Sequence, residues 1–71
     1  MESIYPNLVQ MMVDHRMSYE DLARVISVDK NVIIQKMQGV IPWSLVEGIA
    51  ICSYFHTSDI KFLFLQLDTN T

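Results

Sequence analysis

The sequence predicts an all-α domain that is built from five short helices. Apolar residues recur at intervals of three and four along most of the chain, which is the spacing of amphipathic helices. Small polar residues that favour helix N-termini precede several of these segments. The sequence contains no period-two apolar run and no Asn-Gly or Asp-Gly hairpin turn, so we expect no strand.

Length and composition predict one domain over residues 1–71. The chain has 71 residues, 51% of them hydrophobic, which is typical of a globular protein and too short for a second core. No apolar run approaches the roughly 18 residues that a membrane helix needs, and the first residues do not resemble a signal peptide. The single cysteine, Cys52, is expected to be a buried hydrophobe. We therefore expect a cytoplasmic protein without disulfides.

The first helix is expected to begin near Tyr5-Pro6, because proline is tolerated in a first turn, and to end near His15. Its apolar stripe contains Leu8, Met11 and Met12. The methionines of this region are interpreted as core filler rather than as a flexible binding surface.

Residues 18–39 predict two helices joined by a tight turn. Ser18 is the expected N-cap of the first helix, with Asp21 completing a capping box. Ser27 ends that helix at a position that usually needs a positive φ. Asp29 is expected to cap the second helix, and Gly39 to end it.

The apolar spacing of these two helices is that of a helix-turn-helix, in which the second helix stands clear of the body of the domain. We expect these two helices to share a core. Its side chains come from one face of the first helix, from the turn between the helices and from the inner face of the second helix. These positions are Leu22, Ala23 and Ile26, then Val28, then Ile33 and Met37.

The fourth helix is expected to follow Pro42-Trp43-Ser44 and to be central and buried, because it is apolar nearly all round. Its predicted stripe contains Leu45, Ile49, Cys52 and Phe55. Gly48 is expected to allow close approach of a neighbouring helix. Trp43 is expected to cover the core, with a partner for its indole N–H.

The fifth helix is expected to run from about Asp59 to Leu67, with Ser58 as its cap. Ile60, Leu63, Phe64 and Leu67 form its predicted core face. Phe62 and Leu65 then point outward, which suggests a partner surface. The tail at 68–71 is expected to be frayed.

With these elements in order, the chain resembles the phage-repressor and Cro-type helix-turn-helix family, often called lambda-repressor-like or XRE-like. The resemblance covers residues 7–64. It rests on Leu22-Ala23, Val28, Ile33, Met37, Gly39, Pro42, the Ile51-x-x-x-Phe55 pair and the Ser58…Leu63-Phe64 ending. It implies a five-helix domain that binds double-stranded operator DNA, usually as a homodimer, and regulates transcription. The homodimer interface is then expected at Phe62 and Leu65.

The resemblance also implies roles for single residues. Lys30, Asn31 and Gln35 match base-reading positions of the recognition helix, at about 29–38, and Ile34 is added as a contact to thymine methyl groups. The expected contacts to the DNA backbone are Arg16, Tyr19, Arg24, Lys36 and Gln38. For the basic residues, plain solvation or pairing, such as Arg24 with Glu20, is the alternative.

Net charge opposes this interpretation, because the chain carries −3 whereas DNA-binding domains are usually basic. Its distribution is more favourable. Four of the five basic residues (Arg16, Arg24, Lys30, Lys36) lie in segment 16–36 against three acidic ones (Glu20, Asp21, Asp29), which leaves that segment at +1. Residues 1–15 and 37–71 each carry −2.

A second function stays open, since the chain departs from the family at several apolar positions. Val32, Ile34, Val40 and Ile41 could form a protein-binding patch on a scaffold that no longer reads DNA, as in an antirepressor. An enzyme is not expected, because no nucleophile–base set, phosphate-binding glycine loop or metal-ligand cluster is present. His15 and His56 are interpreted as surface residues, and no cofactor is expected.

Overall fold

The computed structural model describes residues 3–67, and five α-helices account for the regular structure of that range. The helices are α1 (Pro6–Asp14), α2 (Tyr19–Ile26), α3 (Lys30–Met37), α4 (Leu45–Tyr54) and α5 (Ile60–Leu63). Residues 3–67 contain no strand, so the all-α prediction is confirmed. The predicted frayed tail at 68–71 lies outside the described residues.

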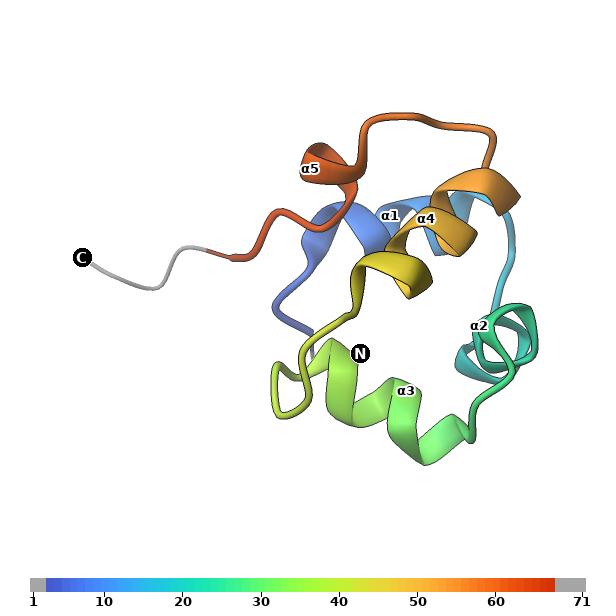
Figure 1. Cartoon of the computed structure of the whole chain (residues 1–71), viewed down its shortest axis with the longest axis vertical. Coiled ribbons are helices and arrows are strands. Elements are labelled where there is room, and N and C mark those ends of the chain that lie inside the picture. Colours follow the sequence, from blue (N-terminus) through green and yellow to red (C-terminus); the bar gives the residue numbers. More distant parts are fainter. Residues whose placement is uncertain (1–2, 68–71) are drawn as a thin grey trace.

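The helices pack around one core (Figure 1). α2 packs against α3 and α4, while α5 packs against α4 and α1. The fully buried side chains come from all five helices: Leu8, Met12, Leu22, Ile33, Met37, Ile51 and Leu63. Val28 packs at the edge of this core, as expected for the turn between α2 and α3. Met11 and Met17 also pack against it, so the interpretation of these methionines as core filler is confirmed.

Side-chain caps fix where α2, α3 and α4 begin. The Asp21 amide donates to Ser18 Oγ (3.1 Å) and the Ser18 amide donates to Asp21 Oδ2 (3.0 Å), which is the predicted capping box. Asp29 Oδ1 accepts from the Asn31 amide at 2.8 Å, also as predicted. Ser44 and Glu47 form a second capping box at the start of α4.

The prediction that α4 is buried all round is wrong. Leu45 and Ile49, which belong to the predicted stripe, are 69% and 56% exposed. The stripe that is buried consists of Gly48, Ile51, Cys52 and Phe55, which share one helical face. α4 packs against α2 and α5 and contacts α3 through Glu47, and no described element covers the side that carries Leu45 and Ile49.

Gly48 behaves as predicted, because a Cβ at this position would lie 2.9 Å from Ile60 Cδ1. The indole of Trp43 covers the core beside Tyr5 and Phe64, with ring centroids 6.4 and 5.4 Å away. Its N–H, however, is buried and has no hydrogen-bond partner within residues 3–67, so that part of the prediction is wrong.

α5 is a single turn, much shorter than the predicted helix from Asp59 to Leu67. Its cap is Asp59, whose Oδ1 accepts from the Phe62 amide at 3.1 Å, and not Ser58. Leu67 is 54% exposed and does not face the core. The Leu67 amide donates instead to the Ile4 carbonyl at 2.6 Å, and this pairing holds the chain in a non-helical path after α5.

Candidate nucleic-acid interface

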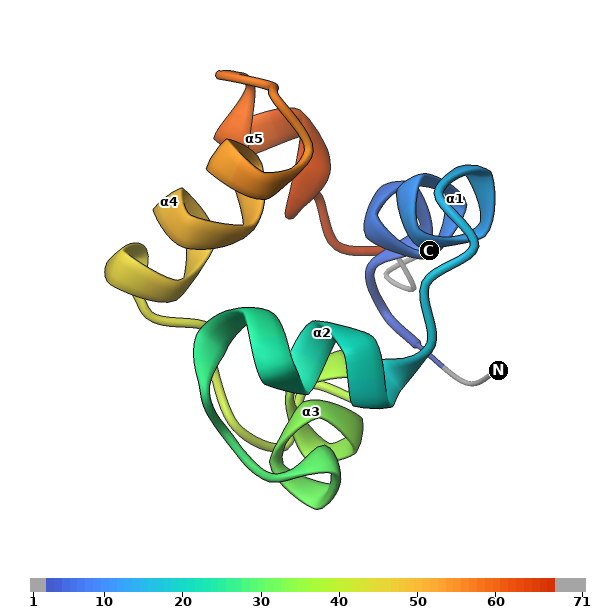
Figure 2. The same ribbon diagram turned by 90° about the vertical axis from the view of Figure 1, so that its right-hand side faces the viewer.

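The turn between α2 and α3 has the geometry that a helix-turn-helix needs (Figure 2). Ser27 adopts the left-handed conformation at φ 58° and ψ 48°, as predicted for this position. The Val28 amide donates to the Ala23 carbonyl at 3.0 Å and closes the end of α2. Asp29 then caps α3, so three residues turn the chain from one helix into the next.

The outward side of α3 carries exposed polar side chains. Ile33, Lys36 and Met37 are buried on the inner side of the helix. Asn31, Gln35 and Gln38 are exposed on the opposite side, and Lys30 is exposed in the first turn. Figure 1 shows α3 at one edge of the bundle. The second helix therefore stands clear of the core on its polar side, as the sequence predicts.

The exposed amide side chains of two α3 residues and of the C-cap residue Gln38 are available for intermolecular hydrogen bonds. The side chains of Asn31, Gln35 and Gln38 make no hydrogen bond to any residue that the structure describes. Each carries donors and an acceptor on one planar group, which suits the N6/N7 edge of adenine. Ile34, which was predicted to contact bases, is half-buried at the margin of this side.

Lys36 was predicted to contact a phosphate, and this prediction is wrong. Its side chain is only 8% exposed. Nζ donates to Glu47 Oε1 at 2.7 Å and to the Pro42 carbonyl at 3.1 Å, and lies 5.5 Å from the centroid of the Trp43 ring. The sequence does contain a signal for this burial, because Lys36 lies three residues after Ile33 and therefore on the inner side of α3.

Glu47 completes this interaction from α4. Burial raises the pKa of its carboxyl, but hydrogen bonds from Lys36 and from the Ser44 amide outweigh that effect and leave the pKa below its ordinary value. Oε1 accepts both hydrogen bonds, at 2.7 and 3.0 Å. The end of α3 is thus tied to the start of α4 by a charged pair that solvent barely reaches.

Tyr19 was predicted to donate to a phosphate at the start of α2, and this prediction is also wrong. Its hydroxyl is buried without a hydrogen-bond partner in the described part of the chain, and burial raises the pKa of the phenol. The ring packs against the core. Tyr19 precedes Leu22, Ala23 and Ile26 at spacings of three, four and seven, so it belongs to the inner face of α2.

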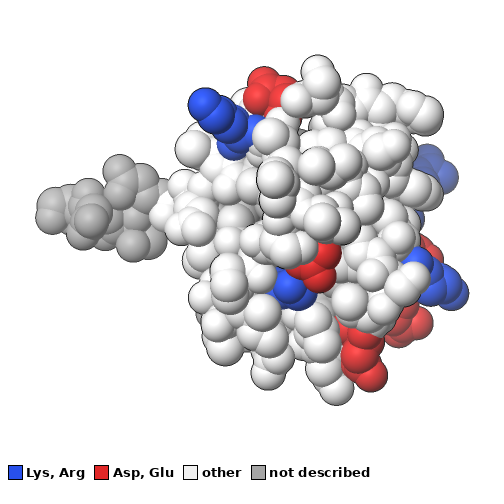
Figure 3. Space-filling view, in the orientation of Figure 1, with Lys and Arg blue, Asp and Glu red and all other residues white. Residues whose placement is uncertain are grey.

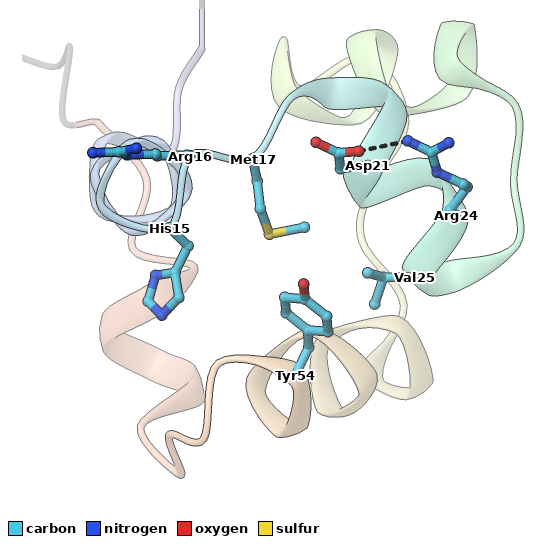
Figure 4. A pocket seen from close by; sticks show the side chains of 7 residues that line it. All are labelled: His15, Arg16, Met17, Asp21, Arg24, Val25 and Tyr54. Atoms are coloured by element: carbon cyan, nitrogen blue, oxygen red, sulfur yellow. Dashed lines mark hydrogen bonds and ion pairs between the residues drawn. The ribbon is translucent and has the colours of Figure 1, made fainter.

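Arg16, Arg24 and Gln38, three of the five predicted phosphate contacts, remain on the surface, and so does Lys30, a predicted base contact. Arg16 and Arg24 border a hollow between α1, α2 and α4, with the Tyr54 side chain pointing into it (Figure 4). Arg24 pairs with Asp21, not with Glu20. Lys30 Nζ lies 3.3 Å from Glu20 Oε1.

These ion pairs leave the cations accessible. The side chains of Arg24 and Lys30 are 74% and 50% exposed. Exposed pairs of this kind are weak and exchange readily with other partners. A phosphate could therefore replace the carboxylate in each pair.

The apolar residues named for a protein-binding patch do not all reach the surface. Val32, Ile34 and Ile41 are half-buried, whereas Val40 is exposed. Cys52 is buried, as predicted, and burial together with Asp59 raises the pKa of its thiol. The described residues hold no group of three or more potential metal ligands.

Comparisons with protein-family models, with curated proteins and with solved structures each return no match to the chain. Within residues 3–67, the helices are all too short to cross a bilayer. A functional proposal for this domain therefore depends on its own side chains and their geometry.

Proposed function

We propose that the protein is a sequence-specific DNA-binding regulator of transcription, of the phage-repressor type, that acts in the cytoplasm without catalytic chemistry. α3 enters the major groove of operator DNA, and Asn31 and Gln35 read base edges. Lys30 contributes at the first turn of α3, where an amine can donate to guanine O6 and N7. Arg16 and Arg24 hold the phosphate backbone on the α1–α2 side.

One observation carries this proposal. The polar side of α3 faces solvent, and its amide groups are not used within the fold. Polar residues on the outer side suit any surface helix, so the support comes from the kind of group: a row of three unpaired planar amides at Asn31, Gln35 and Gln38. In a major groove the same row can form bidentate hydrogen bonds, each of which discriminates between bases by about 1–3 kcal/mol.

The experiment that tests this function is selection of bound duplexes from a random DNA library at low salt. An enriched sequence is expected, and the protein should bind it more tightly than it binds random duplex in a fluorescence anisotropy titration. No enrichment, together with no binding to any duplex in dilute buffer, would overturn the proposal.

The base-reading role of Gln35 has its own test. Gln35→Ala should weaken binding to the selected sequence about tenfold, the equivalent of about 1.4 kcal/mol, while affinity for random duplex changes little. Val13→Ala is the matched control, because Val13 is exposed on α1 and lies outside the proposed interface. Equal losses on selected and random DNA would make Gln35 a positioning residue.

A protein-interaction module is the second candidate, and the burial of Lys36 and Tyr19 favours it. Two of the five predicted backbone contacts are lost to the core, while the net charge remains −3. Val40 adds exposed apolar surface directly after α3. The library selection separates the two candidates, because a module of this kind binds no duplex specifically.

A further inference from the structure

We propose that the outer side of α4 is a self-association surface, which is covered in solution by the same surface of a second copy of the chain. This surface, here the α4 face, consists of Leu45, Val46 and Ile49 with the groove beside them. The inference concerns an interface other than the α3 surface, and it does not depend on DNA binding.

The α4 face consists of apolar side chains that are largely exposed to water. Leu45, Val46 and Ile49 are 69%, 77% and 56% exposed, although they lie within one turn of each other. Contiguous apolar surface of this kind usually marks an interaction site. A partner that covers these three branched side chains would remove apolar surface from water, which is favourable in free energy.

The α4 face carries no charge. Glu47 is the one charged residue in the sequence of α4, and its carboxylate is directed to Lys36 on the α3 side. Figure 3 shows the face on which α4 lies in Figure 1: most of it is uncharged, one acidic and one basic group lie side by side near its middle, and the other charged groups lie towards its edge. A two-fold pairing of this surface would therefore bring no like charges together.

A groove runs beside the exposed ridge, between α4 and α5. It consists of two adjoining hollows of about 420 and 310 Å³, which share Leu45 and Ile60. Their lining contains no charged residue, and Gly48 and Phe64 form part of the floor. The surface thus offers an apolar ridge and an apolar groove side by side.

That combination is what a two-fold symmetric interface requires. In such a dimer the same patch meets itself, so each copy must supply both the protruding and the receiving element. In the proposed dimer, Leu45 and Ile49 of each copy pack into the groove of the other. The groove is apolar, and so is the α4 ridge. The ridge of a second copy is therefore a suitable group to fill the groove.

The outward residues of the last helix are a less suitable site for symmetric pairing. Phe62 and Leu65 are exposed, as predicted. Phe62, however, lines a small hollow together with Asn7, Gln10 and Asp14 of α1. A two-fold axis there would bring the Asp14 carboxylates of both copies towards each other.

In the proposed dimer the exposed side of α3 stays free, since Asn31 and Gln35 face solvent whereas Lys36 is the α3 residue that pairs with α4. The contact between Lys36 and Glu47 also links the two helices directly. Self-association through α4 would therefore fix the positions of two α3 helices relative to each other.

The decisive experiment measures the mass of the full chain in solution, by sedimentation or light scattering, across micromolar concentrations and without DNA. The unmodified chain should show the mass of two chains, and Val46→Glu should give a folded monomer. Val13→Glu, the matched control on exposed α1 surface, should remain dimeric. A monomeric unmodified chain would overturn the proposal, as would a Val46→Glu variant that stays dimeric. In the latter case, a monomeric Phe62→Glu variant would move the interface to α5.

Disulfide crosslinking provides a second readout that does not depend on the Val46→Glu variant folding. Cys52 is the only native thiol and is buried, so an added surface cysteine reports on its own position. Ile49→Cys, at the middle of the ridge, should crosslink on oxidation, and Val13→Cys should not. Equal crosslinking of both variants would reject the α4 interface. Because no DNA is present in either experiment, their outcome is separate from that of the library selection.

Discussion

Lys36 is the buried charged residue of the described chain, and its partner determines what that burial costs. A charge in the interior is tolerated when it is paired and hydrogen-bonded. Glu47 and the Pro42 carbonyl meet both conditions here. Lys36 therefore joins α3 to α4 instead of contributing to the surface charge.

We expect Glu47→Ala to lower the free energy of unfolding by about 3 kcal/mol, because it leaves the Lys36 ammonium buried without a counter-charge. Glu20→Ala is the matched control: it removes the carboxylate of an exposed pair with Lys30 and should cost less than about 1 kcal/mol. Urea titration followed by circular dichroism measures both. Equal effects of the two substitutions would contradict the structural role of the buried pair.

The same carboxylate makes stability depend on pH. The folded-state pKa of Glu47 lies below the ordinary value of 4.5, so the stabilisation is fully present above that pH and is lost as the pH falls through the folded-state pKa. Glu47→Gln should therefore flatten the loss of stability on acidification below about pH 4.5. An unchanged pH profile would show that the pair contributes no proton linkage.

At the scale of the element, the helices that were predicted well are those whose ends are set by local chemistry. The N-caps Ser18 and Asp29 and the left-handed Ser27 bind their own backbone neighbours, so the sequence alone places α2 and α3. α1 also ends within one residue of the prediction.

Which side of a helix is buried depends instead on elements that are distant in sequence. α4 is apolar nearly all round, so its sequence cannot show which of its sides the other helices leave uncovered. After α5 the chain is not helical and Leu67 pairs with Ile4, a contact across almost the whole chain that local sequence does not reveal. Helical spacing, in contrast, is local: it puts Asn31 and Gln35 on the exposed side of α3, and it puts Lys36 and Tyr19 on inner faces, against the phosphate contacts expected of them.

The cap of α5 provides a matched pair of substitutions. Asp59→Ala should lower the free energy of unfolding by about 1 kcal/mol, because it removes the acceptor for the Phe62 amide. Ser58→Ala should change stability by only a few tenths of a kcal/mol, since the Ser58 hydroxyl caps no helix in the structure. Denaturant midpoints measure both variants, and a larger effect at Ser58 would restore the cap that the sequence predicted.

At the scale of the whole molecule, the distribution of charge matters more than its total. The acidic net charge of −3 makes non-specific attraction to DNA weak. With Lys36 paired inside the fold, the cations left around α2 and α3 are Arg16, Arg24 and Lys30. Affinity for an operator must then come largely from base contacts, and the electrostatic part is limited to these three residues.

This limit predicts how binding depends on salt. Each neutralised phosphate contributes about −0.9 to the slope of log affinity against log salt, so three cations, with Lys30 counted, set a limit of about −3 per bound chain and about −5 for a bound pair. Arg16→Ala should make the slope shallower by about one per chain. Lys61→Ala is the control, because Lys61 is exposed on α5, at the opposite end of the bundle from α3 (Figure 1). Anisotropy titrations across a salt series give the slopes. A slope well beyond −5, or equal sensitivity to the two substitutions, would mean that phosphates meet a surface other than the one around α2 and α3.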